Sequence, residues 1–179
     1  MSSDSKINKI RIKRILITIV LVIVGFLLQT TLIQNIRVAG VIPNLMLLIV
    51  IYVSFLNGVY FGISTGLTVG LLYDCMYGSL IGINMLAFLL IGYFSGICSR
   101  LYRRGNYIIP IILIAIGELI YGIVTYLTDY LLRGKLNVGY YLGKVMFPEY
   151  VYSVVIGIII YGIICLMYED SELKGGNIL

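Results

Sequence analysis

The chain has 179 residues, of which 60% are hydrophobic and only 12% are charged. This composition lies outside the range of soluble globular domains, so we expect one membrane domain with little mass outside the bilayer. The net charge of +5 does not favour nucleic-acid binding, because the basic residues flank apolar segments and do not form a basic face.

A polar and basic segment, residues 1–14, precedes an apolar stretch over residues 15–33. A helix over that stretch is about 28 Å long, which is enough to cross the hydrocarbon core. The stretch is too long for a signal peptide and lacks a small-residue cleavage site, so we predict a retained helix. Gln29, Thr30 and Thr31 make its outer end polar on one side, which suits interfacial solvation, back-bonding to backbone carbonyls or a lateral contact with another helix.

Pro43 and Asn44 are expected to start the second helix, because proline is well tolerated in a first turn. The apolar run over residues 42–77 would make a single helix of about 54 Å, too long for one crossing. The Asn57-Gly58 pair near its middle predicts two short or tilted helices joined by a tight turn.

Basic residues set the number of crossings. A further span over about residues 82–98 is followed by the cluster Arg100, Arg103 and Arg104, which we expect in the cytoplasm together with the N-terminus. Two segments on the same side of a membrane are separated by an even number of crossings. Four spans between them satisfy this condition, and three do not.

The remaining chain predicts a fifth span over about residues 107–128 and a sixth over about residues 148–167. The sequence thus predicts an all-α integral membrane protein, a bundle of six transmembrane helices over residues 15–168, with an acidic cytoplasmic tail over residues 169–179. Both termini are expected in the cytoplasm, because nine of the 13 Lys and Arg residues then lie on the cytoplasmic side. The four outside are Arg37, Arg133, Lys135 and Lys144.

Glycine recurs in four-residue steps through the third span. The series, here called the glycine ridge, comprises Gly58, Gly62, Gly66 and Gly70, continued by Asp74, Gly78 and Gly82. Residues four apart in a helix lie one turn above each other, so the ridge is a groove without side chains. Small residues of this kind are a main source of helix association in lipid. The ridge therefore predicts a helix-packing or partner-binding face. Gly92 and Gly96 in the fourth span form a second face of this kind, which is consistent with tight packing between the third and fourth spans.

Asp74 lies near the outer end of its span, and Asn84 begins the next helix on the same side. We expect Asp74 to contact interfacial water, to accept hydrogen bonds from loop amides around residues 78–84, or to pair with Asn84.

Glu118 lies near the middle of the fifth span. A central acidic group costs roughly 2–3.5 kcal/mol on an insertion scale, so Glu118 should face the bundle in a protonated or hydrogen-bonded form. A structural carboxyl or a contact with a partner subunit is favoured over a proton or ion path. The chain has no His, and its three Cys have no metal-ligand spacing. Without a nucleophile–base pair or a phosphate-binding loop, we predict no catalytic residue, cofactor or metal.

Four segments in this order resemble a known family: LLQTTLIQ (27–34), VIPNLMLLIVIY (41–52), GLTVGLLYDCMYGSLIGINML (66–86) and GYFSGICSRLYRR (92–104). The family is the bacterial rod shape-determining protein MreD. The Pro-Asn helix start, the Gly-x3-Gly-x3-Asp core and the Gly-x-Asn after it are the specific parts. The resemblance is good over about residues 10–105. Further on, MFPEYVYSVV (146–155) looks like the start of the family's last helix, with Ser153 where an Asn is expected.

The resemblance implies a non-enzymatic inner-membrane component of the cell-elongation complex, which synthesises peptidoglycan and maintains the rod shape of the cell. Its implied partners are the bitopic protein MreC, the actin-like MreB filament and the RodA-type glycan polymerase with its transpeptidase, in direct or indirect contact. The family is also similar, in its six-helix plan, to the substrate-binding subunits of energy-coupling-factor vitamin transporters, a similarity that says little about activity.

Two functions follow as hypotheses. The first is a scaffold that holds partner transmembrane helices through the glycine ridge and the polar cluster at its outer end, which includes Asp74 and Asn84. A homodimer is also considered. The loop with Arg100, Arg103 and Arg104 would meet anionic lipid or a cytoplasmic partner, although topology alone explains its charge. The second is a substrate-binding subunit of a small-molecule transporter. Such a subunit normally has small residues on its first helix, whereas residues 15–33 offer only Gly25 and no Ala.

Overall fold

The computed structural model describes residues 2–32, 43–77, 82–101, 108–131 and 146–173, together with residues 139 and 143. These residues form six α-helices: α1 (Ser2–Leu27), α2 (Leu45–Asn57), α3 (Val59–Tyr77), α4 (Ile83–Ile97), α5 (Ile108–Thr125) and α7 (Phe147–Leu173). Short turns extend three of them: the π-helical turns Leu28–Leu32 and Tyr126–Leu131 after α1 and α5, and the 3₁₀ turn Cys98–Leu101 after α4. Gly78, Arg103 and Arg104 lie outside the described residues.

Four apolar helices within this part of the chain are long enough to cross a membrane, over Arg11–Thr31, Val59–Met76, Ile83–Arg100 and Ile108–Thr128. The helix Leu45–Asn57 and the apolar part Phe147–Ile160 of α7 are shorter. At 1.5 Å per residue, the 13-residue helix α2 is about 20 Å long, against a hydrocarbon core of about 30 Å. The fold is therefore an all-helical bundle with four long apolar spans, and six crossings stay a prediction.

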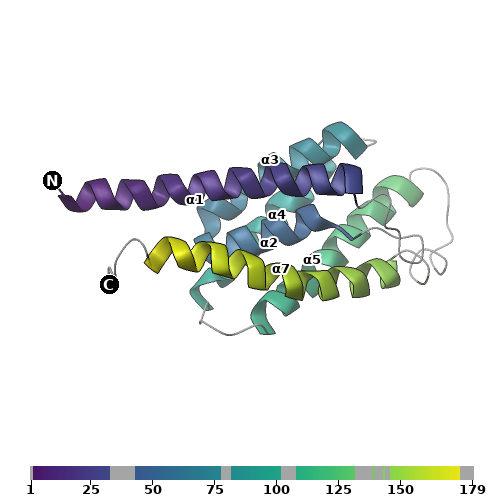
Figure 1. Ribbon diagram of the computed structural model, residues 1–179. Coiled ribbons are helices and arrows are strands. Elements are labelled where there is room, and N and C mark those ends of the chain that lie inside the picture. The colour runs from purple at the N-terminus through teal and green to yellow at the C-terminus, as the bar shows by residue number, and fades with distance from the viewer. Residues whose placement is uncertain are drawn as a thin grey trace.

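Helix α2 is the centre of the bundle. It contacts each of the other five helices, and every residue from Leu45 to Phe55 is buried. Its sequence LMLLIVIYVSFLN has no charged side chain, and a helix that is apolar on all sides is suited to complete enclosure. Figure 1 shows α1 and α7 along one side of the bundle, with the start of α1 and the end of α7 at the same end.

The predicted break between the second and third helices is confirmed. Helix α2 ends at Asn57, Gly58 has a φ of 91°, and α3 begins at Val59. A φ in this region strains residues with a Cβ atom, which explains why glycine occupies the turn. The amide of Gly58 donates to the carbonyl of Ser54 at 2.8 Å, and the carbonyl of Gly58 accepts from the amide of Gly62 at 3.0 Å. The chain thus reverses with both backbone groups of the turn residue paired.

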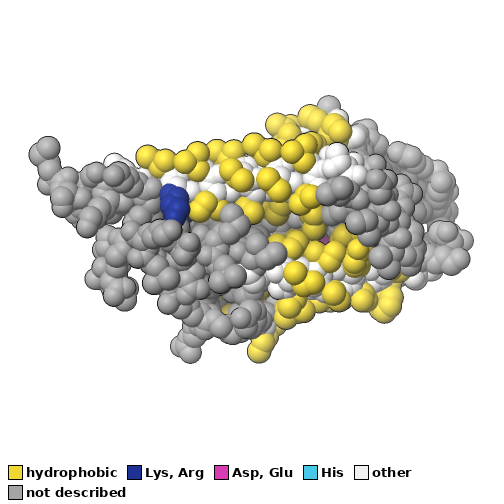
Figure 2. Space-filling view, in the orientation of Figure 1, with side chains coloured by type: hydrophobic (Ala, Val, Ile, Leu, Met, Phe, Trp, Pro, Cys, Tyr) yellow, Lys and Arg dark blue, Asp and Glu magenta, His cyan; other side chains and the backbone are white. Residues whose placement is uncertain are grey.

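Most large side chains on the outside of the helices are apolar. Figure 2 shows hydrophobic side chains over most of the described surface on the viewed face. On α1 alone, the exposed fractions of Leu16, Val20 and Leu27 are 57%, 52% and 55%. Apolar surface of this extent is unfavourable in water and is the normal exterior of a helix bundle in lipid.

Candidate functional site

The glycine ridge of α3 lies against α4 of the same chain. A Cβ atom added at Gly62 would overlap the carbonyl group of Gly92. At Gly66 it would lie 2.5 Å from the carbonyl oxygen of Phe88, and at Gly70 it would overlap the backbone of Met85. Carbon atoms do not approach other heavy atoms this closely, so no side chain fits at these three positions without moving α4.

Helix α4 contributes glycines to the same contact. A Cβ atom at Gly96 would lie 2.6 Å from the Cα atom of Val59 at the start of α3. The backbones of α3 and α4 are therefore in direct contact from the Gly58 turn to Gly70. Because α4 fills this face, a partner helix has no room there while the α3–α4 hairpin is intact. The ridge is a packing face within the chain, and a partner contact has to use another surface.

Asp74 links the end of α3 to the start of α4. Its carboxylate is 2% exposed and accepts from three backbone amides at the start of α4: Gly82 at 2.8 Å, Met85 at 3.0 Å and Asn84 at 3.3 Å. The first amides of a helix have no partner within the helix, and the helix dipole favours a negative charge at that end. Asp74 is thus an N-terminal cap supplied by the preceding helix. The Asn84 contact is made by its backbone.

Gly82 permits this cap to form. It precedes α4 with a φ of 105°, a conformation that L-residues with a Cβ atom rarely adopt. In the sequence, Asp74 of Gly-x3-Gly-x3-Asp and Gly82 of Gly-x-Asn are eight residues apart. In the structure, the amide of Gly82 donates directly to the Asp74 carboxylate. Together, the Gly-x3-Gly-x3-Asp and Gly-x-Asn motifs therefore form the hydrogen-bonded closure of a helical hairpin.

Two side chains close the start of the central helix. The Oδ1 atom of Asn44 accepts from the amide of Leu47 at 3.1 Å, and the Oε1 atom of Gln29 accepts from the amide of Leu45 at 3.0 Å. Gln29 lies at the end of α1, so its hydrogen bond ties α1 to α2. Of the interpretations of the polar end of the first helix, Gln29 thus makes a lateral contact within the chain. Thr30 and Thr31 instead donate to carbonyls of their own helix.

Glu118 lies on the inner side of α5 and is 4% exposed. Ser153 of α7 faces its carboxyl, and Glu149 lies near it one turn earlier on α7. Among the described residues, neither Oε1 of Glu118 nor Oγ of Ser153 has a hydrogen-bond partner. An ionised carboxylate in such surroundings is strongly disfavoured. The geometry suits an uncharged polar group packed between α5 and α7.

Three aromatic rings next to this region connect α3, α4 and α5. Ring centroids are 5.6 Å apart for Tyr73 and Phe88, 6.0 Å for Tyr73 and Tyr121, and 5.5 Å for Phe88 and Tyr121. Tilted and edge-on pairs at these distances are attractive beyond their buried area.

A hydrogen bond from the hydroxyl of Tyr52 on α2 to the carbonyl of Gly157 on α7, at 2.5 Å, was not foreseen from the sequence. A tyrosine in the middle of an apolar helix was the signal that it needed a partner.

Arg100 is exposed at the end of the turn that follows α4. It lies at the Gly58 end of the hairpin, where α4 ends, away from Asp74.

A groove between α1 and α3, of about 530 Å³ with Arg11 at one end, was not predicted from the sequence. Its residues are spread over two helices that are far apart in sequence, and single-helix periodicity does not predict such a surface.

Long apolar helices, a backbone-tight hairpin and a lipid-like exterior define a multi-pass helical membrane protein. The model of the family described as rod shape-determining protein MreD matches residues 9–170. The chain therefore belongs to the MreD family, as its sequence segments indicated, and is a membrane protein of the rod-shape system. No curated protein and no solved structure matches the chain, so its similarity to energy-coupling-factor subunits stays a prediction.

Proposed function

We propose that this protein is a non-enzymatic scaffold of the bacterial inner membrane that holds transmembrane segments of the cell-elongation complex. The observation that carries the proposal, together with family membership, is the distribution of contacts. The interior is fixed by the chain's own backbone packing and by the Asp74 cap, whereas the exterior of the described helices is largely apolar. A protein built in this way offers partners a rigid lateral surface within the bilayer.

The proposed contact lies on the outward faces of the bundle, since the glycine ridge is occupied by α4. The occupant we propose is the membrane-spanning helix of an MreC-type bitopic partner. Contacts with an MreB-type filament and a RodA-type polymerase complex would be direct or pass through that partner. Exposed apolar positions suited to test the outward faces of four of the helices are Val20 on α1, Phe94 on α4, Ile112 on α5 and Val155 on α7.

The proposed topology has six crossings and both ends in the cytoplasm. Two observations support it: the start of α1 and the end of α7 lie at the same end of the bundle in Figure 1, and Arg11, Lys13 and Arg14 precede the apolar part of α1. Fusing a reporter that fluoresces only in the cytoplasm to either terminus tests this. Both fusions should fluoresce, and loss of signal from one of them contradicts an even number of crossings.

The scaffold proposal is tested by photo-crosslinking in living rod-shaped cells. A benzophenone amino acid is placed in turn at Val20, Phe94, Ile112 and Val155. We expect at least one position to crosslink to the bitopic partner, and the others to remain uncrosslinked as internal controls. A folded protein that captures no component of the elongation complex from any face contradicts the proposal. Purification with a stoichiometric vitamin-sized molecule would favour a carrier subunit instead.

A further inference from the structure

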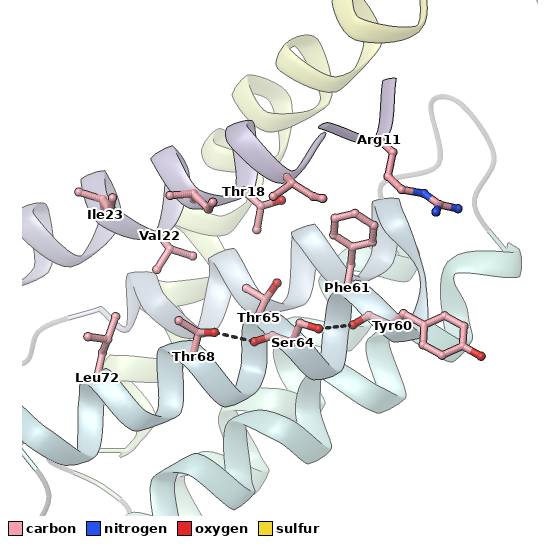
Figure 3. A pocket seen from close by; sticks show the side chains of 12 residues that line it. Arg11, Thr18, Val22, Ile23, Tyr60, Phe61, Ser64, Thr65, Thr68 and Leu72 are labelled. Carbon is pink, nitrogen blue, oxygen red and sulfur yellow. Dashed lines mark hydrogen bonds between the residues drawn. The ribbon is translucent and has the colours of Figure 1, made fainter. Parts of the chain in front are cut away.

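A groove of about 530 Å³ runs between α1 and α3 (Figure 3). Arg11, Tyr60 and Phe61 lie at one end, and Ile23 and Leu72 lie at the other. The two helices run parallel here, because residue numbers rise in the same direction along both walls. From Arg11 to Ile23 the α1 wall measures about 18 Å at 1.5 Å per residue.

The lining of the groove is uncharged except at the Arg11 end. Arg11 is the only charged side chain among the 12 lining residues. Two hydroxyl groups along the α3 wall are paired within their own helix: Ser64 donates to the carbonyl of Tyr60 at 2.9 Å, and Thr68 donates to that of Ser64 at 2.8 Å. On α1, Thr18 donates to the carbonyl of Arg14 at 2.9 Å. The middle of the groove therefore suits an apolar occupant, which need not hydrogen-bond.

We propose that the α1–α3 groove binds one anionic phospholipid, with an acyl chain between the helices and its phosphate group at Arg11. Charge complementarity selects the headgroup, because a guanidinium pairs well with a phosphate. Length selects the rest of the ligand: one leaflet of hydrocarbon is about 15 Å thick, half of the roughly 30 Å core, and the groove is about that long. Tyr60, which is 88% exposed, lies at the same end, where an aromatic ring with a hydroxyl suits the headgroup level.

A partner transmembrane helix fits the groove less well. Such a helix has to cross the whole core and would favour small residues along a seam of matching length. The groove spans about one leaflet, and its walls include Phe61, Val22 and Leu72. The lipid site does not depend on the scaffold function. With the proposed orientation, the Arg11 end of the groove faces the cytoplasm, so the lipid would belong to the cytoplasmic leaflet; this last step alone rests on that orientation.

The experiment measures lipids retained by the whole purified chain. The protein is reconstituted into nanodiscs with equal amounts of phosphatidylglycerol and phosphatidylethanolamine, returned to mild detergent and examined by native mass spectrometry. We expect one retained phospholipid with a preference for phosphatidylglycerol. Arg11→Gln should lower that preference about fivefold, the equivalent of the roughly 1 kcal/mol that one basic residue contributes near a membrane surface. Lys13→Gln removes the same charge two residues away, outside the groove, and should change the preference less than twofold.

A second pair of variants tests the acyl-chain site. Ser64→Phe places a ring in the groove and should abolish retention of both lipids. Thr31→Phe is its control, since Thr31 is also exposed with its hydroxyl bonded to its own helix but does not line the groove. Each variant must elute as a monodisperse species. Equal losses of preference in Arg11→Gln and Lys13→Gln, or wild-type retention in Ser64→Phe, overturn the proposal. A benzophenone at position 64 that captures a protein in cells, and not a phospholipid, also overturns it.

Discussion

Gly62 of α3 and Gly92 of α4 lie back to back, so that a methyl group added to either residue would overlap the carbonyl group of the other. The contact is reciprocal. One and two turns away, Cβ atoms added at Gly66 and Gly70 would likewise overlap the backbone of α4. Helices in lipid gain little from hydrophobic burial, so close backbone packing has to supply much of their association. The α3–α4 hairpin is therefore expected to be the most rigid unit of the bundle.

Replacing Gly92 by Ala should destabilise the protein by about 1–3 kcal/mol, the usual effect of overpacking a close contact. In a helix interior, Ala is favoured over Gly by about 1 kcal/mol, so a neutral context would give the opposite sign. Gly162→Ala on α7 is the matched control, because no atom of the described residues lies within 4 Å of its added Cβ atom. Thermal midpoints of detergent-purified protein, followed by fluorescence-detected size exclusion, should fall for Gly92→Ala and hold or rise for Gly162→Ala. The same midpoint for both variants contradicts the packing argument.

Asp74→Ala should destabilise the hairpin by about 3 kcal/mol, since three amides lose a buried charged acceptor. Asn44→Ala removes a cap that accepts from one amide, that of Leu47, and should cost about 1 kcal/mol. The two variants are compared by the same thermal assay, with backbone protection from hydrogen exchange measured at the start of α4. Protection at Asn84 and Met85 should be lost only in Asp74→Ala. Unchanged protection at Asn84 and Met85 in Asp74→Ala would show that Asp74 is not the main link between α3 and α4.

The break at Gly58 and the small-residue face of α3 were predictable, because both depend on local spacing. The partner of that face was predictable only from a second set of glycines. Glycines at four-residue intervals define a groove, but they do not say which helix lies in it. The matching glycines Gly92 and Gly96 in the next span favoured tight packing of the third and fourth spans, and the structure places α4 there. The partner-binding interpretation of the ridge therefore gives way to a packing role within the chain.

The central position of α2 was not predictable for a different reason. In a soluble protein, an all-round apolar helix has to be buried. In a membrane protein, a helix facing lipid has the same composition, so the sequence of Leu45–Asn57 does not distinguish the centre from the edge. Length is the better indicator: at about 20 Å, α2 is shorter than the core it would cross, and enclosure by five other helices removes the mismatch.

Tyr52→Phe should lower stability by about 1 kcal/mol, because it removes the hydroxyl that donates to the Gly157 carbonyl across α2 and α7. Tyr60→Phe provides the control. It makes the same chemical change at a side chain that is 88% exposed and should leave the thermal midpoint unchanged. Were both variants to behave like the wild type, the α2–α7 hydrogen bond would add nothing to stability.

Glu118→Gln separates the two interpretations of the buried carboxyl. Gln has nearly the shape of an uncharged carboxylic acid, so a structural role predicts a stability change within about 0.5 kcal/mol and normal rod shape in cells that depend on the variant. A role in proton or ion movement predicts a folded protein that fails to restore rod shape, because an amide does not release a proton.

Glu118→Leu adds a second measurement. A carboxyl held by packing predicts no loss of stability, whereas a hydrogen-bonded carboxyl predicts a loss. The Oε1 atom has no hydrogen-bond partner among the described residues, and removing an unpaired buried polar group is close to neutral or stabilising. Ser153→Ala, across the α5–α7 contact, should behave in the same way for the same reason. Thermal midpoints at or above that of the wild type in both variants would support a carboxyl held in place by packing. A marked loss of stability in Glu118→Leu alone would instead show that the carboxyl has a bound partner, and the neighbours to examine first are Ser153 and Glu149.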